Sequence, residues 1–333
     1  MSGLAAEKKE TIRYYLPGRP RVAAIGGGHG LAATLRALRQ CTDRITAIVT
    51  MADDGGGSGM LRDDLGILPP GDIRNCVLAL SNAEPTMTAL LDYRFDTGSL
   101  AGQSFGNLFL AALNGMYGTF DEAVRRMSEV LNITGRVLPV TTTDVRLVAE
   151  FENGAEIEGE SRIFRAKKEN GCRVRRVRLT PESPAPLPEA LTALEEADLI
   201  VIGPGSLYTS IIPNFLVRDI ARATASSRAK KLFIMNIMTQ EGETEGYTSA
   251  DHVRALLRHA PGVVDRVLVN STPIPPAMAE AYLAEGAVPL TADSLEETGL
   301  SVAARPLLSE ESPYARHDEA LLARALAEEL LAL

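Results

Sequence analysis

A glycine-rich turn follows the first apolar run of the chain. Residues 22–25 are apolar, residues 26–30 are Gly-Gly-Gly-His-Gly, and leucines recur at helical spacing from Leu31 onward. A second apolar run, rich in β-branched residues, covers residues 45–51. A strand, a glycine turn, a helix and a second strand in this order are typical of a right-handed parallel βαβ unit. We therefore expect the chain to fold around a parallel sheet.

The same pattern returns in the second half of the chain, after a segment of different character. Residues 136–180 alternate in strand fashion around an Asn153-Gly154 turn. We expect a doubly wound, Rossmann-like α/β fold, a parallel sheet with an inserted antiparallel β element at about 136–180. It forms one domain over residues 21–333, preceded by a flexible leader at 1–20. Apolar runs predict strands at 199–202, 232–235 and 267–269, and periodicity predicts helices at 72–83, 105–116, 120–131, 249–259 and 317–332.

Composition excludes several functional classes. The chain carries 34 Lys and Arg against 43 Asp and Glu, a formal net charge of −9, which disfavours binding to nucleic acid or to an anionic membrane. No apolar run approaches the length of about eighteen residues that a membrane span needs, and the start lacks a signal-peptide core. Neither a P-loop nor a His-Glu-x-x-His zinc motif occurs. We expect a cytoplasmic protein with no nucleic-acid partner and no membrane span.

The first glycine-rich segment has two interpretations. Residues 28–33 match Gly-x-Gly-x-x-Ala, a dinucleotide-binding pattern in which glycines let the backbone approach a diphosphate closely. Asp53, just beyond the second strand, stands where such folds place a carboxylate for the ribose. The alternative is a tight turn that binds nothing, with His29 pointing to solvent. An NAD-dependent oxidoreductase is the least favoured function, because no acid–base pair for hydride transfer is evident.

The second segment places adjacent carboxylates before glycines. Asp53 and Asp54 precede Gly55-Gly56-Gly57, which predicts a mobile loop with an anionic root. Its carboxylates would accept ligand hydroxyls, hold Mg²⁺ beside a phosphate or act as a general base. The alternative is a solvated acidic turn.

The third segment, residues 68–75, leads into a helix. Asp72 is placed to cap this helix, and Arg74 falls in its first turn. A cation there opposes the helix dipole, which is favourable only if an anion lies nearby. The alternative is an ion pair of Arg74 with Asp72 or Asp64.

The fourth segment, Gly-Pro-Gly-Ser at 203–206, follows another predicted strand. Ser206, Thr209 and Ser210 place hydroxyls beside free helix N–H groups, a good environment for phosphate, although Ser206 alone would serve as a cap. Ser104 and Asn107 form a similar but weaker candidate, in which Asn107 would contact a base or sugar or cap the next helix. Asn236, at the end of its strand with Thr239 shortly after, is better placed than most Asn residues to contact a ligand. On the helix at 249–259, His252 and His259 indicate a solvated face rather than a metal pair.

Together these segments resemble the gluconeogenesis factor family (YvcK-like proteins) of the CofD-like superfamily, which is named for a phospholactate transferase. The motifs occur in the family's order across about 20–330. Two departures are evident: His29 stands where the family has Thr, and Gly57 and Met60 replace Ser and Arg. The motifs are GGGHGL, ITAIVTMADDGG, LPPGDIRNCVLAL, YRF, QSFGNLFLAAL, GRVLPVT, ADLIVIGPGSLYTSIIPN, MTQEGETEGYTSADHV and EGAVPL.

The resemblance implies a cytoplasmic regulator that binds a UDP-sugar, notably UDP-N-acetylglucosamine, and supports cell-wall synthesis and cell shape during gluconeogenic growth. It implies that no cofactor is required and that no reaction is established. It also implies a protein partner in cell-wall synthesis, and it is compatible with a homo-oligomer. The transferase branch implies the alternative, a transferase that uses Mg²⁺ and a nucleotide-diphosphate-linked substrate. In this context Arg316, otherwise a surface residue, becomes a candidate ligand of the diphosphate.

The predicted ligand-binding residues lie at the ends of predicted strands or at the starts of predicted helices. No catalytic residue and no metal ligand is assigned, and Mg²⁺ is expected only in company with phosphates. The residues are Gly26, Gly27, Gly28, His29, Gly30, Leu31, Asp53, Asp54, Gly55, Gly71, Asp72, Arg74, Asn75, Ser104, Asn107, Gly203, Gly205, Ser206, Thr209, Ser210, Asn236, Thr239 and Arg316.

Overall fold

The computed structural model describes residues 16, 18–283 and 286–333. Most of the predicted leader at 1–20 lies outside the described residues. At its end, Arg19 pairs with Asp43.

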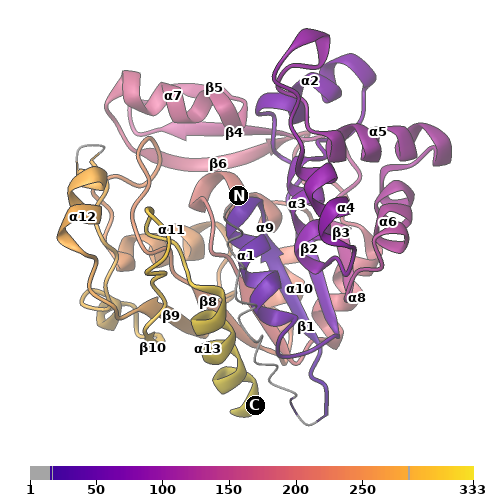
Figure 1. The fold of residues 1–333 in the computed structure, drawn as a ribbon. Helices are drawn as coiled ribbons and strands as arrows, with labels where there is room; N and C mark the ends of the chain where they lie inside the picture. Colours follow the sequence, from indigo (N-terminus) through magenta and orange to yellow (C-terminus); the bar gives the residue numbers. More distant parts are fainter. Residues whose placement is uncertain (1–15, 17, 284–285) are drawn as a thin grey trace, which may run out of the picture.

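A seven-stranded parallel sheet forms the centre of the molecule, in the order β10-β9-β8-β7-β1-β2-β3. From β1 the chain moves outward through β2 and β3 and then returns to β7 on the other side of β1 (Figure 1). The predicted doubly wound sheet is therefore confirmed, with its switch point between β1 and β7. The strands are β1 Val22–Gly26, β2 Ile45–Val49, β3 Arg136–Pro139, β7 Leu199–Ile202, β8 Lys230–Ile234, β9 Arg266–Asn270 and β10 Ser301–Arg305.

The burial of each strand explains whether it could be predicted from the sequence. Every residue of β1, β2 and β7 is buried, so these strands appear as unbroken apolar runs. The edge strand β10 has one buried residue, Ala303, and no apolar run marks it.

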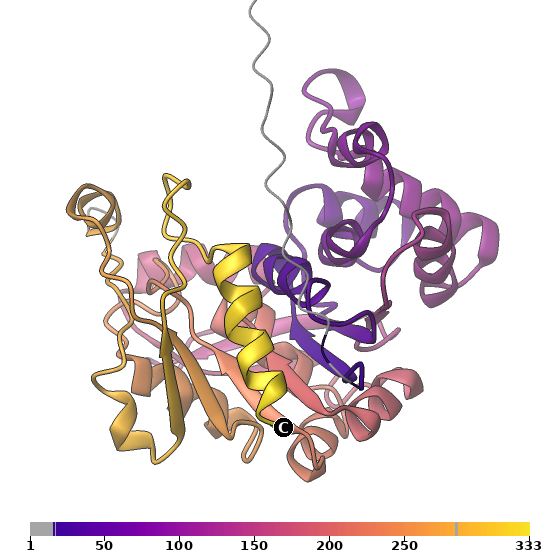
Figure 2. The same ribbon diagram turned by 60° about the horizontal axis from the view of Figure 1, so that its bottom comes forward.

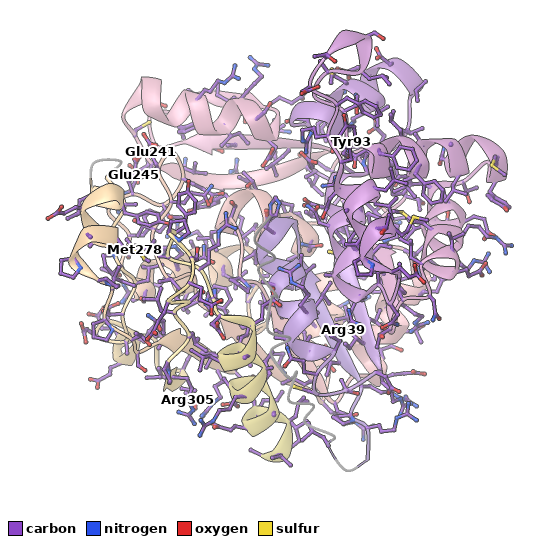
Figure 3. All side chains as sticks on the ribbon, in the orientation of Figure 1. Arg39, Tyr93, Glu241, Glu245, Met278 and Arg305 are labelled. Atoms are coloured by element: carbon purple, nitrogen blue, oxygen red, sulfur yellow. The ribbon has the colours of Figure 1, made fainter. Side chains whose placement is uncertain are left out.

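Helices cover both faces of the sheet. On one face α1 (Gly28–Leu38) packs between α3 (Gly71–Leu80) and α13 (Glu319–Leu331). Behind the sheet in Figure 1, α8 (Pro188–Glu196) packs against α10 (Ile220–Ser226). Arg305 of β10, labelled in Figure 3, pairs with Glu328 and ties α13 to that edge of the sheet. The remaining elements here are the π-helical turn Leu207–Ile211, α9 (Ile212–Phe215), α11 (Ser249–His259), α12 (Pro276–Leu283) and the 3₁₀ turn Leu295–Thr298.

A helical lobe stands beside the sheet and extends away from it in Figure 2. It contains α2 (Gly56–Leu65), α4 (Pro85–Asp92), the 3₁₀ turn Gly98–Leu100, α5 (Phe105–Tyr117) and α6 (Phe120–Val130). The prediction of a mobile loop after Asp54 is wrong, because helix α2 begins at Gly56. A Cβ on Gly59 would lie 2.3 Å from the carbonyl oxygen of Asp54. Gly59 therefore permits close packing of the first turn of α2 rather than mobility.

The inserted antiparallel element is confirmed as a three-stranded sheet in the order β5-β4-β6. Its elements are β4 Arg146–Phe151, β5 Glu156–Glu158, α7 Glu160–Asn170 and β6 Val174–Thr180. It begins at Arg146 rather than at 136, since residues 136–139 form β3, the edge strand of the parallel sheet. An edge strand alternates in polarity as an antiparallel strand does, so the pattern did not separate the two.

One histidine of α11 is buried, and the other is half-buried in contact with the antiparallel sheet. His252 is 1% exposed and its Nδ1 lies 3.1 Å from the carbonyl oxygen of Thr248. Nε2 of His259 accepts the N–H of Val177 of β6 at 3.1 Å. The predicted solvated face is therefore wrong at both positions. None of the described helices is long and apolar enough to cross a membrane.

Candidate functional site

Two glycine turns meet at the switch point of the sheet. The first follows β1 and the second follows β7, and the N–H of Gly203 donates to the carbonyl of Ile25 at 2.9 Å. A Cβ on Gly30 would lie 2.3 Å from the carbonyl oxygen of Pro204, so glycine is needed there for backbone contact. Gly28 has a φ of +62°, a conformation that favours glycine. The predicted ligand-binding turns are therefore brought into contact.

A cavity of about 1280 Å³ opens over these two turns. Its other wall is formed by residues 236–241 after β8 and by residues 309–320 before and within α13. Glu241, labelled in Figure 3, belongs to this wall. Ten predicted ligand-binding residues line the cavity: Gly27, Gly28, His29, Gly30, Gly205, Ser206, Ser210, Asn236, Thr239 and Arg316.

Several of these polar side chains are already engaged by the protein. Asn236 exchanges two hydrogen bonds with the backbone of Gly205, at 3.0 and 2.9 Å. Ser206 Oγ donates to Gln240 at 2.7 Å and makes no cap bond. Thr239 Oγ1 accepts the N–H of Val288 at 2.8 Å. These residues hold the rim of the cavity in shape.

The free N–H groups predicted after Gly-Pro-Gly-Ser are not free. The N–H groups of Tyr208 and Thr209 donate to Oε1 of Glu243 at 2.9 and 3.0 Å. Glu243 is 3% exposed, and burial raises the pKa of its carboxyl to about 7. A carboxylate of the chain itself therefore occupies the place where a phosphate was predicted. Its partners lie 34 and 35 residues away, so no local pattern revealed it.

The start of α1 is the helix N-terminus that faces the cavity. Its N-cap, Gly27, has no side chain to cap the helix, and the N–H of Gly28 donates to the carboxylate of Asp72. The first turn of a helix leaves N–H groups without intrahelical partners, and its dipole favours an anion. Leu31 is fully buried beneath this turn, and Gly26 belongs to β1. These two predicted residues lie behind the site rather than in its lining.

Positive charge gathers at His29. Burial lowers the pKa of its imidazole, and three nearby arginines lower it further, opposed by Asp92. Arg316 forms no ion pair among the described residues, and its guanidinium lies 5.4 Å from the ring centre of Tyr314. Although the chain is acidic as a whole, two of these arginines line the cavity, and Arg316 has no acidic partner among the described residues. The three arginines are Arg316, Arg74 and Arg36, of which Arg36 pairs with Glu319.

An acidic cluster lies on the other side of the first glycine turn. Burial and the charge of Asp53 raise the pKa of Asp72 to about 7. Burial and the charges of Asp53, Asp54 and Asp72 raise the pKa of Glu160 to about 8. Glu160, the first residue of α7, comes from the inserted element, and no feature of the sequence indicated it. The cluster therefore holds protons near neutral pH.

Asp54 and Asp72 have structural contacts that the sequence did not predict. Asp54 Oδ1 accepts the N–H of Ser161 at 2.8 Å and caps α7. Asp72 is not the cap of α3, because the N-cap is Pro70, and its carboxylate accepts the N–H of Gly28 instead. Asp53 Oδ1 accepts the N–H of Gly55 at 2.9 Å. Gly71 lies against this carboxylate: a Cβ added to Gly71 would lie 3.0 Å from Oδ2 of Asp53.

Arg74 lies between α3 and α5, outside the cavity lining. It is 6% exposed, donates to Oδ1 of Asn75 at 2.7 Å and leaves Nε without a partner. The alternative of an ion pair with Asp72 or Asp64 is not found among the described residues, where the guanidinium bonds to Asn75 instead. Ser104 caps α5 by accepting the N–H of Asn107 at 3.2 Å. The structure thus separates this group from the cavity, although Arg74 still acts electrostatically on His29.

Metal ligands are sparse in the part of the chain that the structure describes. There, no three or more His, Cys, Asp or Glu side chains are arranged to hold a metal ion. Mg²⁺ at Asp53 and Asp72 would need further oxygen ligands, which the phosphates of a bound nucleotide supply.

Replacing Glu160 with Gln should stabilise the protein at alkaline pH. Because the folded pKa is raised from 4.5 to about 8, the folded state holds more protons than the unfolded state between these values. Stability is therefore lost as pH rises through this window, and Gln removes the loss. We expect a gain of about 1–2 kcal/mol at pH 8.5 relative to pH 5, after solvent screening.

Urea denaturation at both pH values measures this gain. Glu158→Gln, an exposed change two residues earlier, is the matched control and should alter the pH dependence by less than about 0.5 kcal/mol. Equal effects of Glu160→Gln at the two pH values would show that neither burial nor the neighbouring carboxylates raise the pKa of Glu160 in the folded protein.

Comparisons with known proteins give one consistent result. The family model for CofD, 2-phospho-L-lactate transferase, matches residues 22–308. A protein of Thermoanaerobacterium thermosulfurigenes, named as a gluconeogenesis factor, is 52% identical over 94% of this chain and 97% of its own length. The gluconeogenesis factor of Bacillus subtilis is 49% identical over 90% of this chain and 95% of its own length. A crystal structure of a UPF0052 family member from Bacillus halodurans covers 92% of this chain and 99% of its own, with 43% identity and a TM-score of 0.87.

Proposed function

The chain belongs to the gluconeogenesis factor family, within the CofD superfamily, and we propose that it binds UDP-N-acetylglucosamine in the cavity over the β1 and β7 turns. One observation carries the proposal: the start of α1, where the N-cap Gly27 has no side chain, and an arginine without an acidic partner among the described residues line the same cavity at the switch point of the sheet. Ligands of open α/β sheets bind at such points, and the cavity is large enough for a nucleotide sugar.

The charge distribution orients the diphosphate. The first turn of α1 supplies N–H groups, and Arg316 supplies a cation from the opposite wall. The carboxyls of Asp72 and Glu160, when ionised, repel phosphate from the other side of the first glycine turn. The diphosphate therefore lies towards Arg316 and His29. Mg²⁺, when present, accompanies the phosphates.

Binding without turnover fits a regulatory role. The relatives bear the name gluconeogenesis factor. We propose that this chain reports the level of its nucleotide sugar to a protein partner in cell-wall synthesis, in the cytoplasm, and so supports cell shape.

A second candidate function rests on the acidic cluster. Asp72 has a pKa of about 7 and accepts the N–H of Gly28, which lines the cavity. A carboxyl with this pKa is suited to take a proton from an acceptor hydroxyl that approaches the glycine turn from the side of Asp72. The alternative is therefore a transferase that moves a group from a nucleotide-diphosphate carrier to a hydroxyl.

Calorimetry separates these functions. Titration with UDP-N-acetylglucosamine should give saturable binding with and without Mg²⁺, whereas NAD should give none. Incubation of the complex should yield no new product by chromatography. Binding of NAD alone would overturn the proposal, and transfer or hydrolysis of the bound nucleotide sugar would favour the transferase.

A further inference from the structure

A second, smaller cavity opens at the opposite edge of the central sheet, where β1, β2 and β3 begin. Its volume is about 260 Å³, below the roughly 300–1,000 Å³ of sites for drug-sized ligands, so it suits a small metabolite. Ala193 and Glu196 of α8 form one wall, and the starts of the three strands form the rest. The cavity over the β1 and β7 turns lies beyond the carboxyl ends of the strands, and no described residue lines both cavities.

The register of the sheet places three arginines on one face of these strand starts. β1 and β2 pair in parallel from their first residues, so the residues immediately before them, Arg21 and Arg44, lie side by side. Thr46, two residues after Arg44 and therefore on the same face of β2, pairs with Arg136 of β3. All three arginines line the cavity. Because Arg44 and Arg136 are exposed and Arg21 is half-buried, a ligand from solvent can reach them.

The acidic side chains around this cavity are engaged elsewhere. Glu196 pairs with Arg21 at 3.1 Å, and Asp43 pairs with Arg19, which stands outside the lining. Asp198, just beyond α8, accepts the backbone N–H of Arg21 at 2.7 Å. The three carboxylates therefore act at Arg19 and Arg21.

The other two arginines of the cavity have no acidic partner. Among the described residues, Arg44 forms no ion pair and the guanidinium of Arg136 donates only to Oγ1 of Thr46, at 3.3 Å. The hydroxyl of Thr46 accepts in this contact, so its own hydrogen is available to a ligand. Like charges side by side on neighbouring strands repel one another, a cost that an anion bound between them removes. The chain concentrates these cations here although its formal net charge is −9.

A glycine fixes the backbone beneath the two unpaired arginines. Gly135, immediately before β3, has a φ of +86°, and a Cβ there would lie 2.4 Å from the carbonyl oxygen of Ile45. The turn into β3 therefore lies directly against the start of β2. This contact sets the spacing between the backbones that carry Arg44 and Arg136, so both cations are positioned before a ligand arrives.

We propose that this cavity is a second ligand site, which binds a small dianion between Arg44 and Arg136. The group recognised is a phosphate or a pair of carboxylates, because a guanidinium fork matches two oxygens of either one. Thr46 supplies a further donor, and Arg21 supplies another when it leaves Glu196. The site is separate from the proposed nucleotide cavity and does not depend on nucleotide binding.

Calorimetry with small anions at constant ionic strength tests the site. The probes are inorganic phosphate, glycerol 3-phosphate and malonate, with acetate as the monoanion. At least one dianion should bind the wild type saturably and about tenfold or more tightly than acetate, because two guanidinium groups then face two charges rather than one. A preference for the two phosphates assigns the site to phosphorylated metabolites, and a preference for malonate assigns it to dicarboxylates.

Variants of the two unpaired arginines complete the test. Arg44→Gln and Arg136→Gln should each weaken binding of the preferred dianion about tenfold, the loss expected for one charge-assisted hydrogen bond. Both side chains are exposed, so the midpoint of thermal unfolding without ligand should not fall. Arg324→Gln makes the same charge change on the exposed side of α13 and should leave dianion binding unchanged.

Arg316→Gln distinguishes this site from the cavity over the glycine turns. If the dianion enters that cavity instead, Arg316→Gln should weaken its binding while Arg44→Gln and Arg136→Gln do not. That pattern would overturn the proposal, as would the absence of saturable binding by every dianion, and neither result bears on nucleotide binding. Conversely, failure of UDP-N-acetylglucosamine to bind would overturn the proposed function and leave the dianion site standing.

Discussion

Replacing Arg316 with Gln should weaken the binding of UDP-N-acetylglucosamine by about 10- to 100-fold. Its guanidinium has no acidic partner among the described residues and stands on the cavity wall opposite the start of α1. A hydrogen bond from a charged donor contributes about 1.5–3 kcal/mol, which corresponds to this range. Gln retains part of the length and polarity but loses the charge. The loss should therefore appear in nucleotide affinity and not in stability.

Calorimetry measures the affinity, and thermal unfolding without ligand checks the fold. Arg324→Gln makes the same charge change on the exposed side of α13, where Arg324 lies 3.5 Å from Glu328. This control should bind as the wild type does. If Arg316→Gln binds with unchanged affinity, the diphosphate does not lie between Arg316 and α1, and the orientation proposed above is wrong.

Replacing Gly30 with Ala should have the largest effect on stability. The added Cβ would lie 2.3 Å from the carbonyl oxygen of Pro204, which is backbone and cannot rotate away. Thr34, also in α1, donates from Oγ1 to the carbonyl of Gly203 at 3.2 Å, so a second contact binds α1 to the turn after β7. Overpacking of this kind costs about 2–3 kcal/mol or more of unfolding free energy. Nucleotide binding should weaken as well, since the two turns move apart.

Gly115→Ala provides the matched control. Gly115 lies in α5, and a Cβ there meets no atom within 4 Å. Because alanine has the higher helix propensity, this change should stabilise the protein by about 0.5–1 kcal/mol. Denaturant unfolding of the two variants should therefore shift in opposite directions. A wild-type midpoint for Gly30→Ala would mean that α1 can separate from the Gly203–Gly205 turn at little cost.

Much of the fold was predictable because the parallel sheet is buried on both faces. Its central strands are continuous apolar runs that end in glycine turns, and α11 begins and ends at the predicted residues 249 and 259. The errors fall where burial is partial. Strand β10 has little apolar character, β3 alternates as an edge strand, and the glycines of α2 indicated flexibility although they permit close packing.

The candidate site was predictable as a set of loops but not as a set of contacts. A run such as Gly-Pro-Gly-Ser indicates where N–H groups become available, and the structure does bring the first and fourth segments together over one cavity. The structure also places the Glu243 carboxylate against the N–H groups that follow Gly-Pro-Gly-Ser, where a phosphate was predicted. It brings Glu160 close to Asp53 and Asp72. Neither glutamate lies near these partners in the sequence, so no local pattern could indicate the contact.

The amino-acid sequence alone determined the alternation of strands and helices, the positions of the glycine turns and the family, because each depends on residues that are neighbours in the chain. The tertiary structure decided which of those turns face a shared cavity, which charges gather around His29 and which helix start Glu243 occupies. These properties depend on distances between residues tens or hundreds of positions apart. Packing sets such distances, and packing is a property of the folded chain rather than of any segment.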